Sequence, residues 1–344
     1  MTLLDSGPSL AFDERAASAV RPRRYERLVV ATHRLPSAGG ERPDGEPLEE
    51  WLGALGPRLA GGGWVGAAGT PPATGELAAT APPSLSRHAV DLPRQEAADA
   101  ERFCRRALLP LFHGLPGDCR FEARWWHAYR RTARRFADAV EAAVDPGTLV
   151  WAHGPRLTGV AALLRGRWSL ARWPAAATPG LAHFLHCPFP PLDHFLALPW
   201  RREVLAMLLA HDLLAFESRR DVEHLRECVG ALRDDCRVEG AGDGGLIRVP
   251  ASAGTWREVR LAVVPTGVDF AASSRQAESA EVRLAAERVR AGAGGRRLLV
   301  AVERLEPARG VLPLLAAYGA LLEGRPEAAR DLCLVLAVEA ERDG

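Results

Sequence analysis

The stretch Arg27-Leu-Val-Val-Ala31 is a short apolar run, and it predicts a buried β-strand. Runs of the same kind recur along the chain without a consistently polar face. Strands that are apolar on both faces are typical of a parallel sheet covered by helices on either side. The further predicted strands are Leu149–Ala152, Ala182–Leu185, Asp212–Phe216, Leu261–Val264, Leu298–Val302 and Leu332–Ala337.

Helical stretches alternate with these strands. Large apolar residues recur at helical spacing along Arg124–Val144, which predicts an amphipathic helix. Three more helices are predicted at Pro199–Leu209, Arg219–Leu232 and Pro313–Leu322. Alternating strands and helices indicate the α/β class with a doubly wound sheet. The stretch Glu41–Pro93 is rich in Gly, Pro and Ala and receives no assignment.

Composition narrows the class of protein. The 344 residues are 47% hydrophobic and 25% charged, as in a globular protein with room for two domains. The formal net charge of +1 gives no indication of nucleic-acid or membrane-surface binding, and no apolar run is long enough to span a bilayer. The six cysteines form no CxxC pair and no ligand spacing with histidine. Since no secretory signal is visible, we expect a cytoplasmic protein with unpaired cysteines.

Changes in composition divide the chain into three parts. Acidic residues mixed with arginines predict a flexible N-terminal tail over 1–24. A glycine-rich segment, Gly240–Gly245, precedes the predicted strand Leu261–Val264, and we place a domain boundary after that strand. The expected domains are therefore 25–264 and 265–344. The second has only two predicted strands, which is few for a doubly wound domain.

Several short motifs along the chain resemble one known family. They are Thr32–Pro36, Trp64–Gly69, Leu108–His113, Trp151–Leu157, Phe184–Pro190 with Leu198–Arg201, Asp212–Ser218 and Val302–Gly310. In this order they resemble the trehalose-6-phosphate synthase family of retaining glycosyltransferases. The most specific is Phe-Leu-His-Cys-Pro-Phe-Pro, against Phe-Leu-His-Ile-Pro-Phe-Pro in the family. The resemblance implies two facing Rossmann-like domains of GT-B type, the second incomplete, with the site between them and no metal or cofactor.

The resemblance also assigns roles to single residues. For the donor these are His186, Arg304 and Arg309, for the acceptor phosphate Arg34 and Arg342, and for a donor-diphosphate loop Gly39 and Gly40. Guanidinium groups suit phosphate because they donate two parallel hydrogen bonds. From the residues alone, each role has an alternative. Arg34 could form a surface ion pair, and His186 could be a core histidine. Arg304 and Arg309 could belong to an exposed basic turn, and Gly39 and Gly40 to a plain turn. The family has lysine where Arg309 stands, and the coding bias of a chain without lysine explains that exchange.

Three positions depart from the family pattern and indicate a degenerate acceptor pocket. Gly154 stands where the family has an aspartate that contacts sugar hydroxyls. Leu109 replaces a tryptophan of the acceptor pocket, and Ala100 replaces a tyrosine that binds the acceptor. The stretch Asp212–Ser218 resembles Asp-Leu-Ile-Gly-Phe-Gln-Thr in the family, and we expect it to be scaffold.

The resemblance implies transfer of glucose from a nucleotide sugar, UDP-glucose, to glucose 6-phosphate with retention, in trehalose biosynthesis. The leaving phosphate then serves as the base, and the protein supplies orientation and charge. Activity is left open by Gly154 and the short second domain. The alternatives are a non-catalytic paralogue that binds a sugar phosphate or pairs with a second copy or a full-length synthase, and an incomplete gene product without a stable fold. The sequence does not fix the donor base, the acceptor or the oligomeric state.

Overall fold

The computed structural model describes residues 25–35, 52, 59–68, 85–170, 178–240, 244–251, 254–305 and 309–339. The tail expected over 1–24 lies outside the described residues. So do three of the expected site residues, Gly39, Gly40 and Arg342.

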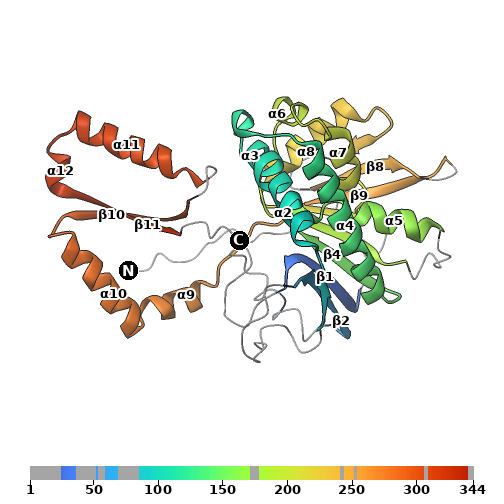
Figure 1. Ribbon diagram of the computed structural model, residues 1–344, viewed down its shortest axis with the longest axis horizontal. Coiled ribbons are helices and arrows are strands. Elements are labelled where there is room, and N and C mark those ends of the chain that lie inside the picture. Colours follow the sequence, from blue (N-terminus) through green and yellow to red (C-terminus); the bar gives the residue numbers. More distant parts are fainter. Residues whose placement is uncertain are drawn as a thin grey trace, which may run out of the picture.

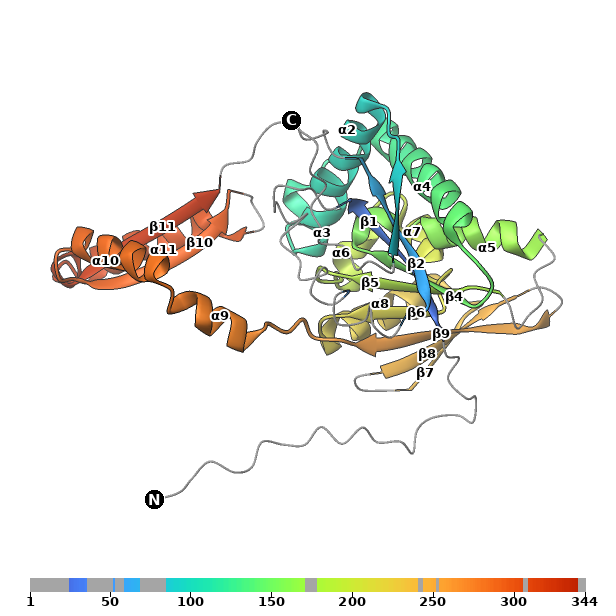
Figure 2. The same cartoon turned by 90° about the horizontal axis from the view of Figure 1, so that it is seen from below.

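A nine-stranded sheet forms the larger part of the molecule (Figures 1 and 2). Its strand order is β3-β2-β1-β4-β5-β6-β9-β8-β7. The bounds are β1 Arg27–Arg34, β2 Gly61–Ala67, β3 Leu85–Val90, β4 Thr148–His153, β5 Gly180–Leu185, β6 Leu213–Phe216, β7 Arg237–Glu239, β8 Gly244–Pro250 and β9 Trp256–Val263. From β3 to β9 in this order the strands pair in parallel, as expected, whereas β9, β8 and β7 pair antiparallel.

The order of the strands fixes where a ligand can bind. From β1 the chain winds outward to β2 and β3, and then from β1 in the other direction to β4, β5 and β6. The sheet is therefore doubly wound, with its topological switch point between β1 and β4. In such sheets the ligand crevice lies outside the carboxyl ends of the strands at the switch point.

Strand β1 shows why the predicted strands are apolar on both faces. Val29 and Ala31 belong to a buried cluster that includes side chains of the helices α4 and α5. Leu28 and Val30 belong to a second cluster, with Trp64 of β2. Because successive side chains of a strand point to opposite faces, each face of the sheet is buried by its own set of contacts.

Helices follow the strands and pack on the sheet (Figure 2). The longer ones are α2 Arg94–Phe103, α4 Ala123–Ala143, α5 Val160–Leu170, α7 Arg201–Leu208 and α8 Arg219–Leu232. Shorter turns are η4 Cys104–Leu108, which is π-helical, α3 Leu109–Phe112, η5 Pro116–Asp118, η6 Pro155–Leu157 and α6 Leu192–Leu196. The three helices predicted in this region are confirmed to within two residues at each end. Among the described residues, no helix combines the length and the apolar character needed to cross a membrane.

The antiparallel edge of the sheet was not predicted. The glycine-rich stretch Gly240–Gly245 lies where β7 connects to β8, and Val238 pairs with Ile247 across the two strands. In β8 only Ile247 and Val249 are buried, and the less buried Arg248 lies between them. This alternation differs from the continuous apolar runs of the parallel strands. Because the prediction searched for such runs, it missed β8.

The residues after β9 form a second, smaller unit. It contains α9 Phe270–Ala277, α10 Ala280–Gly292, β10 Arg297–Arg304, α11 Val311–Gly324, α12 Ala328–Asp331 and β11 Leu332–Glu339. Strands β10 and β11 pair in parallel as a separate two-stranded sheet. Both views show this unit apart from the nine-stranded sheet (Figures 1 and 2). The two strands and the helix predicted in this part of the chain are confirmed.

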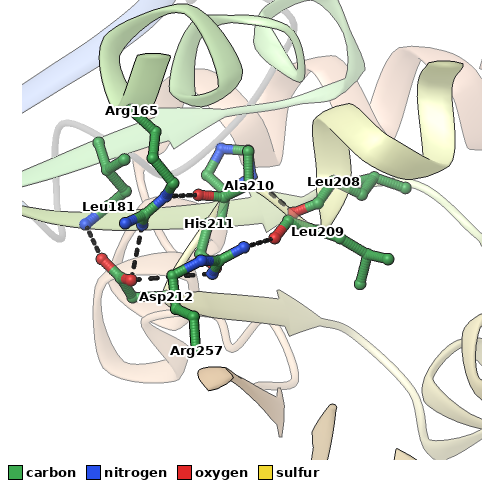
Figure 3. Close-up of polar contacts among 8 residues, drawn as sticks. All are labelled: Arg165, Leu181, Leu208, Leu209, Ala210, His211, Asp212 and Arg257. Atoms are coloured by element: carbon green, nitrogen blue, oxygen red, sulfur yellow. Dashed lines mark hydrogen bonds and ion pairs between the residues drawn. The ribbon is translucent and has the colours of Figure 1, made fainter. Parts of the chain in front are cut away.

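At the amino ends of β5, β6 and β9, polar contacts tie the strands to α5 and α7 (Figure 3). The carboxylate of Asp212 accepts hydrogen bonds from the backbone N–H of Leu181 at 2.9 Å and from Arg165 at 2.6 Å. Arg257 donates to carbonyls of the turn that follows α7. A cavity of about 360 Å³ adjoins this cluster. Since Arg165 and Arg257 are already bonded to Asp212 and to carbonyls, we interpret the cluster as scaffold.

Candidate functional site

The candidate site lies at the carboxyl edge of the nine-stranded sheet. Arg34 is the last residue of β1, Gly154 follows β4, and His186 follows β5. Glu217 follows β6, the next strand in the sheet. The structure thus brings the expected residues Arg34, Gly154 and His186 to one edge, beside the switch point between β1 and β4.

The end of β1 holds Arg34 in place through its backbone. The hydroxyl of Thr32 donates to the carbonyl of Arg34 at 2.7 Å and accepts from the indole N–H of Trp64 at 2.8 Å. A Cβ on Gly66 would lie 2.6 Å from the nitrogen of Leu35, so only glycine permits this approach of β2 to β1. The side chain of Arg34 remains exposed, as a ligand-binding guanidinium requires.

Gly154 has a backbone conformation that other residues rarely adopt. Its φ is 77° and its ψ 167°, a region that is essentially restricted to glycine. Its N–H donates to the carbonyl of Phe184 at 2.9 Å, which fixes the turn after β4 against β5. A Cβ at Gly154 would meet nothing within 4 Å, so the position faces open space. Glycine at this position therefore lacks the carboxylate of the family motif and suits a backbone conformation that other residues rarely adopt.

We expect Gly154→Ala and Gly154→Asp each to lower the free energy of unfolding by about 1–3 kcal/mol, because the strain is in the backbone and does not depend on space. Equilibrium unfolding in urea measures the difference. Gly230→Ala is the matched control, since Gly230 lies within α8, without positive φ, and a Cβ there also meets nothing within 4 Å. Equal effects at Gly154 and Gly230 would show that the conformation of Gly154 is not strained for a side chain.

An ion-pair cluster that sequence reasoning missed lies beside Gly154. Arg156 of η6 donates two hydrogen bonds of 2.8 Å to the carboxylate of Glu101 on α2. His33 Nε2 lies 3.6 Å from the same carboxylate, and Arg105 lies 4.0 Å from it. Burial alone would raise the pKa of Glu101, but the hydrogen bonds and the charge of Arg156, with His33 and Arg105, lower it to about 2. Glu101 is therefore a carboxylate throughout the ordinary pH range.

Ala100 and Leu109, the other two positions at which the sequence departs from the family pattern, belong to the segment that carries Glu101. Ala100 is 7% exposed and lies in the core near the end of α2. Leu109 is partly buried and packs against the same core cluster. Between them the helix widens into the π-helical turn η4, a feature that is frequent at functional sites.

His186 lies in a loop that α8 holds firmly. The buried carboxylate of Asp221 accepts a hydrogen bond from the N–H of Phe189 at 2.8 Å, and His224 Nδ1 lies 2.7 Å from the carbonyl of Phe189. His186 Nδ1 lies 2.9 Å from Glu217 Oε1, and its side chain is 23% exposed. The ring lies 5.8 Å from that of His153, between ring centroids. His186 is thus partly accessible and paired, unlike a fully buried core histidine.

The expected diphosphate residues lie at the corresponding edge of the second sheet. Arg304 is the last residue of β10, and the exposed Arg309 precedes Gly310, whose φ of 72° starts helix α11. A strand end followed by a helix N-terminus is a favourable place for phosphate. Both views show β10 and α11 apart from the nine-stranded sheet (Figures 1 and 2). The structure therefore forms two groups of site residues, and it does not bring Arg304 and Arg309 to His186.

The cysteine thiols and possible metal ligands of the described residues have the following environment. Cys187 follows His186 directly, but burial raises the pKa of its thiol far above the usual range, so a thiolate nucleophile is not available. In the ranges that the structure describes, His, Cys, Asp and Glu side chains form no group of three or more that could hold a metal ion. The six cysteines are free, and Cys104, Cys187 and Cys228 are buried.

Comparisons with known sequences agree with this geometry. The sequence profile of glycosyltransferase family 20 matches residues 49–344. The chain is 30% identical to a trehalose-6-phosphate synthase of Mycolicibacterium gilvum, over 90% of this chain and 62% of that protein. It is 32% identical to a bifunctional trehalose-6-phosphate synthase/phosphatase of Thermoproteus tenax, over 71% of this chain and 31% of that protein. The chain thus spans less than two thirds of the length of either relative.

Solved structures share the fold. One, "Trehalose-6-phosphate from E. coli bound with UDP-2-fluoro glucose", has a TM-score of 0.74 at 26% identity and covers 92% of this chain and 65% of its own. An alpha,alpha-trehalose-phosphate synthase (UDP-forming) from Burkholderia xenovorans in complex with glucose-6-phosphate has a TM-score of 0.70 at 22% identity, covering 92% and 66%. The expected GT-B type of fold is confirmed, and this chain covers about two thirds of each of these solved structures.

Proposed function

We propose, since this chain belongs to glycosyltransferase family 20, that it transfers glucose from UDP-glucose to glucose 6-phosphate with retention and so forms trehalose 6-phosphate. The observation that carries the proposal is the joint position of Arg34 and His186 at the carboxyl edge of the first sheet, beside its switch point. The relatives named above are synthases of this product, and the two solved structures hold a UDP-sugar analogue and glucose-6-phosphate.

Under this proposal, each domain binds one of the two substrates. We assign residues 25–264 to the acceptor side, where the exposed Arg34 binds the phosphate of glucose 6-phosphate. We assign residues 265–344 to the donor side, where Arg304 and Arg309 bind the diphosphate. Arg342 and the pair Gly39 and Gly40 keep the roles that the resemblance gives them, as a second acceptor-phosphate ligand and a donor-diphosphate loop. The free cysteines fit a reducing compartment, and we place the activity in the cytoplasm.

The reaction needs little covalent chemistry from the protein. The acceptor hydroxyl attacks the anomeric carbon on the face from which UDP leaves, and the leaving phosphate takes the hydroxyl proton. The chain contributes by holding two ligands in one geometry and by placing positive charge at the leaving diphosphate. The described residues fit this division, since burial disfavours the thiolate of Cys187, and Arg34 and Arg304 lie at strand ends. Under this proposal, the site residues of the first sheet and those of the β10–α11 turn bind one pair of substrates. We expect the two groups to come together when both substrates are bound.

Release of UDP from UDP-glucose by the full chain, measured with and without glucose 6-phosphate, tests the function. We expect release that depends on glucose 6-phosphate. Arg34→Ala is expected to lower kcat/KM for glucose 6-phosphate by about 10–100-fold, because a hydrogen-bonded charged partner of the phosphate contributes about 1.5–3 kcal/mol.

Arg34→Lys is the control for charge, and it should restore part of the loss because lysine keeps the charge without the bidentate geometry. Unfolding curves of both variants show whether β1 remains intact. No UDP release from folded wild-type chain at high concentrations of both substrates would contradict the proposed function. Release without any dependence on glucose 6-phosphate would contradict the proposed acceptor.

A further inference from the structure

Glu217 and His186 come together because of the register of neighbouring strands. Leu185 of β5 pairs with Phe216 of β6, so the residues that follow, His186 and Glu217, leave the sheet side by side. Phe216 pairs in turn with Val263 of β9, and the N–H of Val264 donates to the carbonyl of Phe216 at 2.7 Å. The ends of three adjacent strands therefore meet at one point of the candidate site.

A chain of polar contacts crosses these three strand ends. The hydroxyl of Thr266, after β9, donates to Oε1 of Glu217. The same oxygen lies 2.9 Å from Nδ1 of His186. Thr266 thus restrains the carboxylate that faces the imidazole, which is the arrangement of an orienting group, a carboxylate and a histidine.

Of the two ring nitrogens of His186, Nδ1 is the one that faces the carboxylate of Glu217. Nδ1 of His186 is buried and makes no hydrogen bond of good geometry within the described residues, and the nearest charged group is the carboxylate of Glu217, whose Oε1 lies 2.9 Å away. A buried polar atom without a partner is costly, so a proton on Nδ1 facing Glu217 is favoured. The side chain is nevertheless 23% exposed, and the exposed part of the ring excludes Nδ1.

Other charged groups lie around this pair without replacing it. His153 of β4 lies 5.8 Å from His186 between ring centroids. Asp221 is engaged by Ser218 and by the N–H of Phe189, and Arg156 is engaged by Glu101. Glu217 is therefore the carboxylate in direct contact with His186.

We propose that Glu217 is a positioning residue that holds His186 as the Nδ1–H tautomer and thereby presents Nε2 to the ligand as a hydrogen-bond acceptor. A neutral histidine has one donor and one acceptor nitrogen, and the partner of the first fixes the role of the second. A sugar hydroxyl in the cleft then donates to Nε2. The matching family motif has glutamine at position 217, which leaves the tautomer free, so the fixed acceptor is a feature of this chain. The tautomer itself is independent of the proposed function, whereas its use toward a sugar rests on it.

The ring-nitrogen NMR signals of His186 test the tautomer without any substrate. The full chain is labelled with ¹⁵N-histidine and measured at a pH where ordinary imidazoles are neutral, and His186→Gln identifies the signals. We expect a protonated Nδ1 and an unprotonated Nε2 in the wild-type chain, and a shift toward protonated Nε2 in Glu217→Gln. Glu223→Gln, which removes the same charge from an exposed position of α8, should leave the pattern unchanged.

An Nε2–H tautomer in the wild-type chain, or an identical pattern in Glu217→Gln, would overturn the proposal. Glu217→Gln preserves shape and the acceptor for Thr266, so unfolding curves should remain close to wild type. If UDP release is observed, Glu217→Gln should raise KM for the sugar ligand more than it lowers kcat, and an unchanged KM would also overturn the use of Nε2. If no UDP release is observed, the proposed function fails while the NMR result still decides the tautomer.

Discussion

Replacing Arg304 by alanine is expected to lower kcat/KM for UDP-glucose by about 10²–10³-fold, the usual effect of removing one preorganised charge from a transition state that develops negative charge. Arg304 ends β10. In the proposed function its guanidinium opposes the negative charge that develops on the leaving diphosphate. The effect should appear mainly in kcat, because the charge of the diphosphate rises as the glycosidic bond breaks. Steady-state kinetics of UDP release measures both constants.

Arg309 provides the matched comparison. Arg309→Lys keeps the charge and introduces the residue that the family motif carries, so it should retain activity within about tenfold, whereas Arg309→Ala should lose far more. Arg309 is exposed, so neither change should alter the unfolding curve. If Arg304→Ala keeps the kcat/KM of the wild-type chain, the assignment of the β10–α11 turn to the donor site is contradicted.

Glu101 is expected to make the stability of the first domain depend on pH in the acid range. Its pKa in the folded chain is lowered from 4.5 to about 2 by Arg156 and its neighbours, against the opposing effect of burial. A lowered folded-state pKa contributes stability above the unfolded pKa and loses it as the pH falls toward the folded value. The contribution is on the order of 3 kcal/mol near neutral pH and disappears between about pH 5 and pH 2.

A comparison with Glu101→Gln isolates this contribution from other carboxylates. The free energy of unfolding in urea is measured for both chains at several values of pH between neutrality and the acid limit of the folded state. We expect the wild-type chain to be more stable near neutrality and the two curves to converge as the pH falls. A difference that stays constant across this range would contradict the assigned pairing of Glu101 with Arg156.

The parallel sheet could be predicted because its strands are apolar on both faces. Arg27–Ala31 and Ala182–Leu185 have this pattern, and their strands lie at the centre of the sheet. Strand β2 has three glycines at its start, and β7 is only three residues long, so neither offers an apolar run. Local patterns thus identify strands with a continuous apolar run and miss those that are glycine-rich or very short.

The candidate site was predictable only where a motif carried it. Arg34, His186, Arg304 and Arg309 were predicted from the resemblance. In the structure Arg34 and Arg304 end strands, His186 follows one, and Arg309 lies just before helix α11. The pairing of Arg156 with Glu101 joins residues 55 positions apart, and packing decides it, so no local pattern reveals it. For the Glu217 contact a signal was present, since Glu217 replaces a neutral residue of the matching motif. The stretch that contains Glu217 was interpreted as scaffold, because the sequence does not show its contact with His186.

The anomeric configuration of the product tests the central claim most directly. The full chain is incubated with UDP-glucose and glucose 6-phosphate, and the product is identified by proton NMR. The account predicts trehalose 6-phosphate with both anomeric centres in the α configuration, formed together with UDP. A product with an inverted centre, or no disaccharide phosphate from a chain shown to be folded, would contradict it.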